Sequence, residues 1–91
     1  MSDQGYDDMY EELAEQNPEA LIAVGFEKAY VGHTAHSPTT YPCAVYDANK
    51  CLRILMQDGL SYTEAIEHLE FNVIGAYVGE GTPIFVWSRH P

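Results

Sequence analysis

Positive charge is scarce in this chain. Of its 91 residues only four are Lys or Arg, against 14 Asp and Glu, so the formal net charge at pH 7 is −10. Binding of nucleic acid through its phosphates needs a cationic surface, and so does attraction to anionic lipid. The composition therefore excludes non-specific nucleic-acid binding and disfavours an anionic membrane surface as partner.

Long apolar runs are also lacking. No run of 18 apolar residues is present, and the chain opens on Met-Ser-Asp. We therefore expect neither a membrane span nor a signal peptide, and a protein that stays in the cytoplasm of the cell that makes it. A length of 91 residues leaves room for one small hydrophobic core, which predicts a single domain over 1–91.

Cysteine is limited to two residues, and they do not complete a metal site. Zinc needs four ligands in a tetrahedron, and His33 and His36 could supply two of them. Cys43 is expected on a strand, however, and Cys51 on the same helix face as Leu55, where a small buried side chain is wanted. We expect no metal and no cofactor, and a cytoplasmic setting disfavours a disulfide.

Signatures of catalysis are missing as well. A Cys–His nucleophile pair needs an electropositive setting, which an acidic chain does not offer. Gly79-Glu80-Gly81 is followed by Pro83 and a predicted strand, whereas a phosphate-binding loop precedes a helix. No two carboxylates are isolated in an apolar setting that would separate their pKa values. The sequence predicts a protein that is not an enzyme.

What the chain does have is acid concentrated at one end. Residues 1–27 hold eight of the 14 acids and no Lys or Arg. The eight are Asp3, Asp7, Asp8, Glu11, Glu12, Glu15, Glu19 and Glu27. Met9, Tyr10 and Leu13 recur among them at helical spacing, which predicts an amphipathic helix over 7–16. Such a segment is either a solvated face or an interaction surface.

The next segments are harder to interpret. Asn17-Pro18 is typical of a helix start, so we expect a second short helix from 18 to about 27, within an acidic N-terminal segment 1–30. The run 21–24 fits a buried strand equally well. Residues 31–42 have loop composition, and a loop of this length in a small domain favours a functional or mobile role.

From residue 43 the pattern is clearer and defines a core over 43–87. Residues 43–46 and 84–87 are predicted strands. Asp47 is a helix N-cap, Gly59 a helix end, and Ser61 with Glu64 forms a capping box. We expect a helix-dominated α+β fold, in which a helical hairpin from Asp47 to about Tyr77 packs on a short two-stranded β-ribbon.

Several side chains of this core have expected places. Leu55 and Leu69 are expected in the hydrophobic core. Phe71, Ile74 and Val78 are expected to form a second buried face of the last helix. Gly75 indicates close approach of another element, and Asn72 is expected to bond backbone at a junction between strand and helix. His68 is expected on the outer face.

Part of this core resembles a family of small proteins found in bacteriophages and prophages. The resemblance spans 43–86, about half of the chain, and its most specific block is Phe71–Pro83. Besides that block it involves Val45-Tyr46-Asp47, Lys50-Cys51, Leu55-Met56, Gly59, Ser61-Tyr62, Glu64-Ala65, Glu67, Glu70 and Phe85. It implies a phage or mobile-element origin and a strand, a helical hairpin and a return through a Thr-Pro turn. The family brings no established activity, so no catalytic residue is implied.

Two functions remain open. The first is an acidic binding protein that occupies a basic surface on a host nucleic-acid-handling or defence protein, as an anti-CRISPR-like or DNA-mimicking inhibitor. Its expected contact residues are Tyr6, Asp7, Asp8, Tyr10, Glu11, Glu12 and Glu15. The second is a non-enzymatic accessory or assembly protein whose acidity serves solubility. A homodimer or a contact with a partner is expected through the edge at 84–87 or a face carrying Tyr62 and Tyr77.

Overall fold

The computed structural model describes residues 4–76 and 79–88, and for residues 4–7 it describes the backbone alone. Its helices are α1 (Gln4–Gln16), the 3-10 turn η1 (Glu27–Ala29), α2 (Ala48–Gln57), α3 (Tyr62–His68) and the π-helical turn η2 (Leu69–Ile74). Its strands are β1 (Tyr30–His33), β2 (Ala44–Asp47) and β3 (Ile84–Val86). The fold is α+β, as the sequence predicts.

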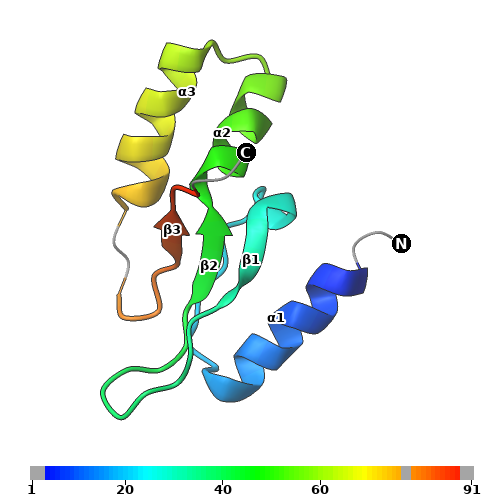
Figure 1. Ribbon diagram of the computed structural model, residues 1–91, viewed down its shortest axis with the longest axis vertical. Helices are drawn as coiled ribbons and strands as arrows, with labels where there is room; N and C mark the ends of the chain where they lie inside the picture. Colours follow the sequence, from blue (N-terminus) through cyan, green and yellow to red (C-terminus); the bar gives the residue numbers. More distant parts are fainter. Residues whose placement is uncertain (1–3, 77–78, 89–91) are drawn as a thin grey trace.

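The three strands form one sheet in the order β1-β2-β3. β1 runs antiparallel to β2, with a bulge between Tyr30 and Gly32, and β3 runs parallel to β2. The predicted pairing of 43–46 with 84–87 is therefore confirmed, with bounds shifted by one residue. The predicted two-stranded ribbon is wrong, because β1 adds a third strand from residues that the sequence assigned partly to a loop (Figure 1).

In the helical hairpin, α2 begins and ends, and α3 begins, where the local signals place them. The Asp47 carboxylate accepts hydrogen bonds from the backbone N–H groups of Asn49 and Lys50, which caps α2. Gly59 follows α2 with a φ of 112°, a conformation that favours glycine. Ser61 and Glu64 form the predicted capping box at the start of α3. These three predictions are confirmed.

The far end of the hairpin differs from the expectation. α3 continues into η2, which ends at Ile74, before the expected helix end at about Tyr77; Tyr77 and Val78 themselves lie outside the described residues. Phe71 is 77% exposed, so the second apolar face is not buried as a whole. Asn72 is exposed, and its side chain hydrogen-bonds the exposed His68 ring one turn earlier; among the described residues it makes no bond to backbone at a junction between strand and helix.

The expectation for Gly75 also needs correction. A Cβ at this position would lie 2.7 Å from the carbonyl oxygen of Glu70. The close approach is therefore made by the last turn of its own helix and does not come from a different element.

Residues 18–26 form no helix and no strand, so both expectations for this segment are wrong. The Asn17 side chain accepts a hydrogen bond from the Glu19 N–H, which makes a turn, but no helix follows. Instead the Leu21 N–H bonds the Gly81 carbonyl oxygen, and the Ala23 N–H bonds the Tyr46 hydroxyl oxygen. Because these backbone N–H groups bond distant parts of the chain, they are not available for the hydrogen bonds of a local helix.

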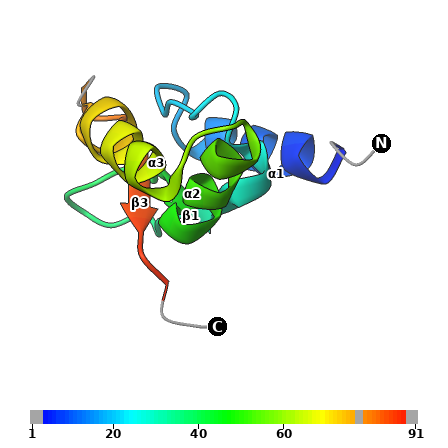
Figure 2. The ribbon, with the colours of Figure 1, turned by 90° about the horizontal axis from the view of Figure 1, so that it is seen from above.

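The hydrophobic core lies on one side of the sheet. It contains Leu55 and Leu69, as predicted, together with Leu13, Ala29, Tyr30, Ala44, Tyr46, Ala48, Cys51 and Ala65. Tyr46 of the central strand β2 is fully buried in this core, where its ring lies between the Tyr30 ring of β1 and the Phe85 ring of β3. The view from above in Figure 2 shows that α1 and the segment 17–26 lie on the side of the sheet that faces away from the viewer of Figure 1. In the described residues, no helix is long and apolar enough to cross a membrane.

Candidate functional site

Helix α1 presents a continuous acidic face. Asp8, Glu11, Glu12 and Glu15 are all exposed, and their spacing of three and four residues puts them on one side of the helix. They extend over roughly 10 Å of helix axis. None of the four carboxylates has a hydrogen-bond or ion-pair partner within the part of the chain that the structure describes. We refer to these four residues as the acidic face.

The opposite side of α1 fixes the helix to the sheet. Leu13 is buried, and the Tyr10 hydroxyl is 3.1 Å from that of Tyr46. The Tyr10 ring also meets the Tyr30 ring edge-on, with centroids 4.7 Å apart. Because α1 is held through this tyrosine cluster, the acidic face is displayed on a fixed support and not on a solvated tail.

The expected contact residues therefore divide into two groups. The four acids of the acidic face are placed together and face outward. Tyr10 is partly buried and turned toward Tyr46, so it is not an exposed anchor for a partner and we remove it from the candidate interface. The side chains of Tyr6 and Asp7 lie outside the described residues.

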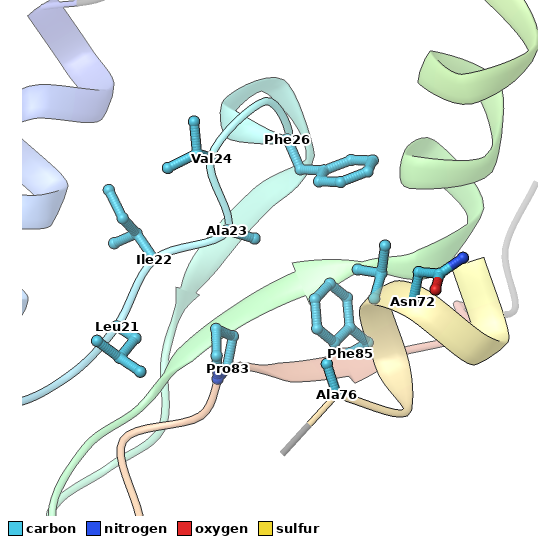
Figure 3. A pocket seen from close by; sticks show the side chains of 10 residues that line it. Leu21, Ile22, Ala23, Val24, Phe26, Asn72, Ala76, Pro83 and Phe85 are labelled. Carbon is cyan, nitrogen blue, oxygen red and sulfur yellow. The ribbon is translucent and has the colours of Figure 1, made fainter. Parts of the chain in front are cut away.

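An apolar groove lies on the helix-bearing side of the sheet (Figure 3). Its volume is about 320 Å³, and its walls are the segment 21–26 on one side and η2 with the following residues on the other. Pro83 and Phe85 form its floor. The lining consists of Leu21, Ile22, Ala23, Val24, Phe26, Asn72, Val73, Ala76, Pro83 and Phe85. Asn72 is the one residue of this lining that is not apolar.

Sequence reasoning missed this groove. The run 21–24 is apolar at every position, which favours burial, yet Leu21, Ile22 and Val24 are all exposed. The available signal was the absence of a polar face in that run, because an amphipathic surface helix would have one. Together with the turn at Asn17, the lack of a polar face in residues 21–24 was compatible with an extended segment that lines an apolar groove.

The histidines and cysteines are dispersed. His33 bonds the Thr34 carbonyl oxygen, and His36 lies edge-on to Tyr41 with ring centroids 5.3 Å apart. Cys51 is buried in the core, and burial raises the pKa of its thiol to about 12. Cys43 is partly exposed, just before β2. Within residues 4–76 and 79–88 no three His, Cys, Asp or Glu residues are grouped as metal ligands would be.

Comparison of the chain with protein-family models, with curated proteins and with solved structures found no match. The resemblance to small phage and prophage proteins therefore stays a prediction based on the sequence pattern alone.

Proposed function

We propose that this chain is a non-enzymatic binding protein of phage or prophage origin that acts in the cytoplasm of the host cell. It inhibits a host nucleic-acid-handling or defence protein by occupying the basic surface that normally receives nucleic acid. The observation that carries this proposal is the acidic face: four carboxylates on one side of an anchored helix, with no hydrogen-bond or ion-pair partner among the described residues.

The electrostatics of the acidic face are suited to this role. Its four charges lie within roughly 10 Å of helix axis, and duplex DNA carries one charge per about 1.7 Å. The two charge densities are of the same order. A cationic groove built for phosphates would attract this face at long range and raise the association rate. Since α1 is already ordered, binding costs little conformational entropy.

Neutralising the acidic face tests the proposal. The variant Asp8→Asn with Glu11→Gln, Glu12→Gln and Glu15→Gln keeps side-chain size and removes four charges. We expect it to lose capture of a host protein that the natural chain retains from lysate. Each exposed charge pair contributes on the order of 0.2–1 kcal/mol, so the four changes together are needed for a clear effect. Duplex DNA added to the natural complex should release the captured protein.

A charge-matched control separates position from net charge. Asp58→Asn with Glu67→Gln removes two exposed charges from the helical hairpin, and Glu11→Gln with Glu15→Gln removes two from the acidic face. Only the second pair should weaken capture and flatten its salt dependence. If both pairs weaken capture equally, the effect depends on the net charge of the protein and not on the position of the acidic face. If the natural chain captures nothing at low or moderate salt, the inhibitor proposal fails.

A second candidate function is supported by exposed apolar side chains on the sheet face that points away from the core. Ile84 and Val86 are 41% and 42% exposed, and in β3 they alternate with the partly buried Phe85, so both lie on the sheet face opposite Phe85. Exposed apolar side chains on a sheet face favour self-association, as in an accessory or assembly protein. Of the other expected dimer contacts, Tyr62 is exposed and Tyr77 lies outside the described residues.

Self-association has its own test. The accessory-protein candidate predicts a homodimer by light scattering at high micromolar concentration. Val86→Asp should convert that dimer to a monomer, because two carboxylates would then be buried at the contact. A monomer for the natural chain at that concentration removes this candidate and leaves the inhibitor proposal untouched.

A further inference from the structure

A second cavity lies where the C-terminal end of α1 meets the loop between β1 and β2. Its volume is about 790 Å³, within the range of ligand pockets. Three segments of the chain line it: residues 16–19, residues 39–43 and the turn at 80–81. The cavity shares no lining residue with the apolar groove. Gln16 of its wall directly follows Glu15, so the cavity begins where the acidic face ends.

The three segments are joined to one another, so the cavity is preformed. The Asn17 side-chain amide donates a hydrogen bond of 2.9 Å to the Pro42 carbonyl oxygen, which joins the helix end to the loop. The Cys43 thiol lies 3.6 Å from the Glu80 carbonyl oxygen, which joins the loop to the turn. A Cβ at Gly81 would overlap the backbone of the first segment, so these two are in direct contact. A ligand therefore does not have to order the cavity before it binds.

Two carboxylates give the cavity its charge. Glu19 and Glu80 are distant in sequence, and both line the cavity. Neither carboxylate has a hydrogen-bond or ion-pair partner in the part of the chain that the structure describes. No Lys or Arg is among the described residues that line it. This charge repels phosphate and carboxylate ligands and favours a cation.

The end of α1 favours a cation independently of these carboxylates. The last carbonyl groups of a helix carry partial negative charge. Pro18 has no N–H, so the Ala14 carbonyl oxygen four residues earlier has no helical donor, and the last turn of α1 contains no basic residue. Gln16 and Asn17 place this helix end in the cavity wall. The partial charge of the helix therefore adds to the charge of the carboxylates.

An aromatic ring in the lining distinguishes between kinds of cation. Tyr41 lines the cavity and is 64% exposed, and its ring lies edge-on to that of His36, with centroids 5.3 Å apart. A guanidinium group is planar, stacks on aromatic rings and donates forked hydrogen bonds to carboxylates. An ammonium group is a more strongly hydrated point charge. A ring beside two carboxylates therefore suits a guanidinium group best.

We propose that this cavity binds the guanidinium group of an arginine side chain on the host partner. Glu19 and Glu80 supply the opposite charge, and the Tyr41 ring supplies the stacking surface. The inference deepens the proposed function and rests on it for the basic character of the partner. The acidic face attracts the partner at long range, and the cavity beside it holds one side chain and gives the contact its specificity.

Short peptides test the cavity without knowledge of the partner. The probe is a blocked Gly-Arg-Gly tripeptide. Its citrulline isostere keeps the shape without the charge, and a lysine peptide keeps the charge without the planar group. In NMR titrations of the natural chain, the arginine peptide should give saturable shifts at Thr39, Glu80 and Gly81, with a dissociation constant about fivefold or more below that of either control. Shifts confined to α1, or equal binding by either control, would overturn the inference.

A charge-matched pair of variants locates the binding site. Glu19→Gln with Glu80→Gln should raise the dissociation constant of the arginine peptide about fivefold or more, because both charges of the cavity are removed. Asp58→Asn with Glu67→Gln removes two exposed charges from the helical hairpin and should leave the constant within about twofold. Circular dichroism melts check that both variants fold. Unchanged binding by the cavity variant, or equal losses from both variants, contradicts the proposal.

The stacking surface has a test of its own. Tyr41→Ser should raise the dissociation constant of the arginine peptide about threefold or more and bring it close to that of the lysine peptide. Tyr62→Ser is the matched control, since Tyr62 is 58% exposed on α3, and it should leave both constants unchanged. If Tyr41→Ser weakens the arginine and lysine peptides equally, or neither of them, the assignment to a guanidinium group is wrong.

The failures of the two proposals can be distinguished. If the cavity variant captures the host protein as well as the natural chain does, while the variant of the acidic face does not, the cavity inference is wrong and the proposed function stands. If the arginine peptide binds in the cavity as expected but no host protein is captured, the proposed function alone fails.

Discussion

Replacing Leu69 by alanine is expected to lower the free energy of unfolding by about 2–5 kcal/mol. Leu69 is fully buried where α3 passes into η2, in the same core as Leu55 and Ala65. Truncation removes its apolar contacts and leaves a cavity that a small domain cannot easily collapse. Since the total free energy of unfolding of a domain is about 5–15 kcal/mol, this one change would remove a large share of the stability.

Leu21 provides the matched control for Leu69. It has the same side chain but is 41% exposed at the wall of the groove. Leu21→Ala should therefore cost far less, and the melting temperatures from circular dichroism should separate the two variants clearly. Similar losses from both substitutions would show that the hairpin does not pack on the core as described.

The parts of the fold that the sequence predicted well depend on contacts between near neighbours. Asp47 caps α2 through residues two and three positions later, and the Ser61 box closes within three residues. Gly59 satisfies a local backbone requirement. Such signals depend only on neighbouring residues. The sequence therefore predicted correctly where α2 begins and ends and where α3 begins.

The errors concern segments whose partners are distant in sequence. Residues 17–26 have a local helix-start signal, but their backbone bonds reach Pro42, Tyr46 and Gly81. β1 pairs with β2 across a turn-rich loop. Because β1 contains a bulge and a glycine, residues 30–33 lack the alternation of apolar and polar side chains that would predict a strand. Tertiary contacts outweighed local preference in both cases.

For the candidate site, the sequence predicted the amphipathic character of α1 but not the use of each side of the helix. The acids recur at helical spacing, and their common outward side follows from that spacing. The role of Tyr10 does not follow, because a tyrosine suits both an interface and a core. Its partner Tyr46 lies 36 residues away, and only the folded arrangement assigns Tyr10 to the core.

Raising the pH above about 9 is expected to destabilise the protein strongly. Burial raises the pKa of the Cys51 thiol from 9.0 to about 12, and the nearby Asp47 charge adds to the effect. Burial is also the leading cause that raises the pKa of the Tyr10, Tyr30 and Tyr46 hydroxyls above 10.0. The Tyr30 hydroxyl is buried without a hydrogen-bond partner in the described part of the chain, so its ionised form would be especially unfavourable.

The direction of this pH dependence follows from proton linkage. Between pH 9 and 12 the unfolded chain has lost the Cys51 proton while the folded chain still holds it, so rising pH favours unfolding. Three pKa units correspond to about 4 kcal/mol as an upper limit for Cys51, and the tyrosines add to the loss above pH 10. Urea denaturation midpoints should be level from pH 7 to 8 and fall steadily above pH 9. Cys51→Ala should make this fall shallower, and Cys43→Ala, which changes a partly exposed thiol, should not. A midpoint that stays constant up to pH 11 would contradict the burial of all four groups.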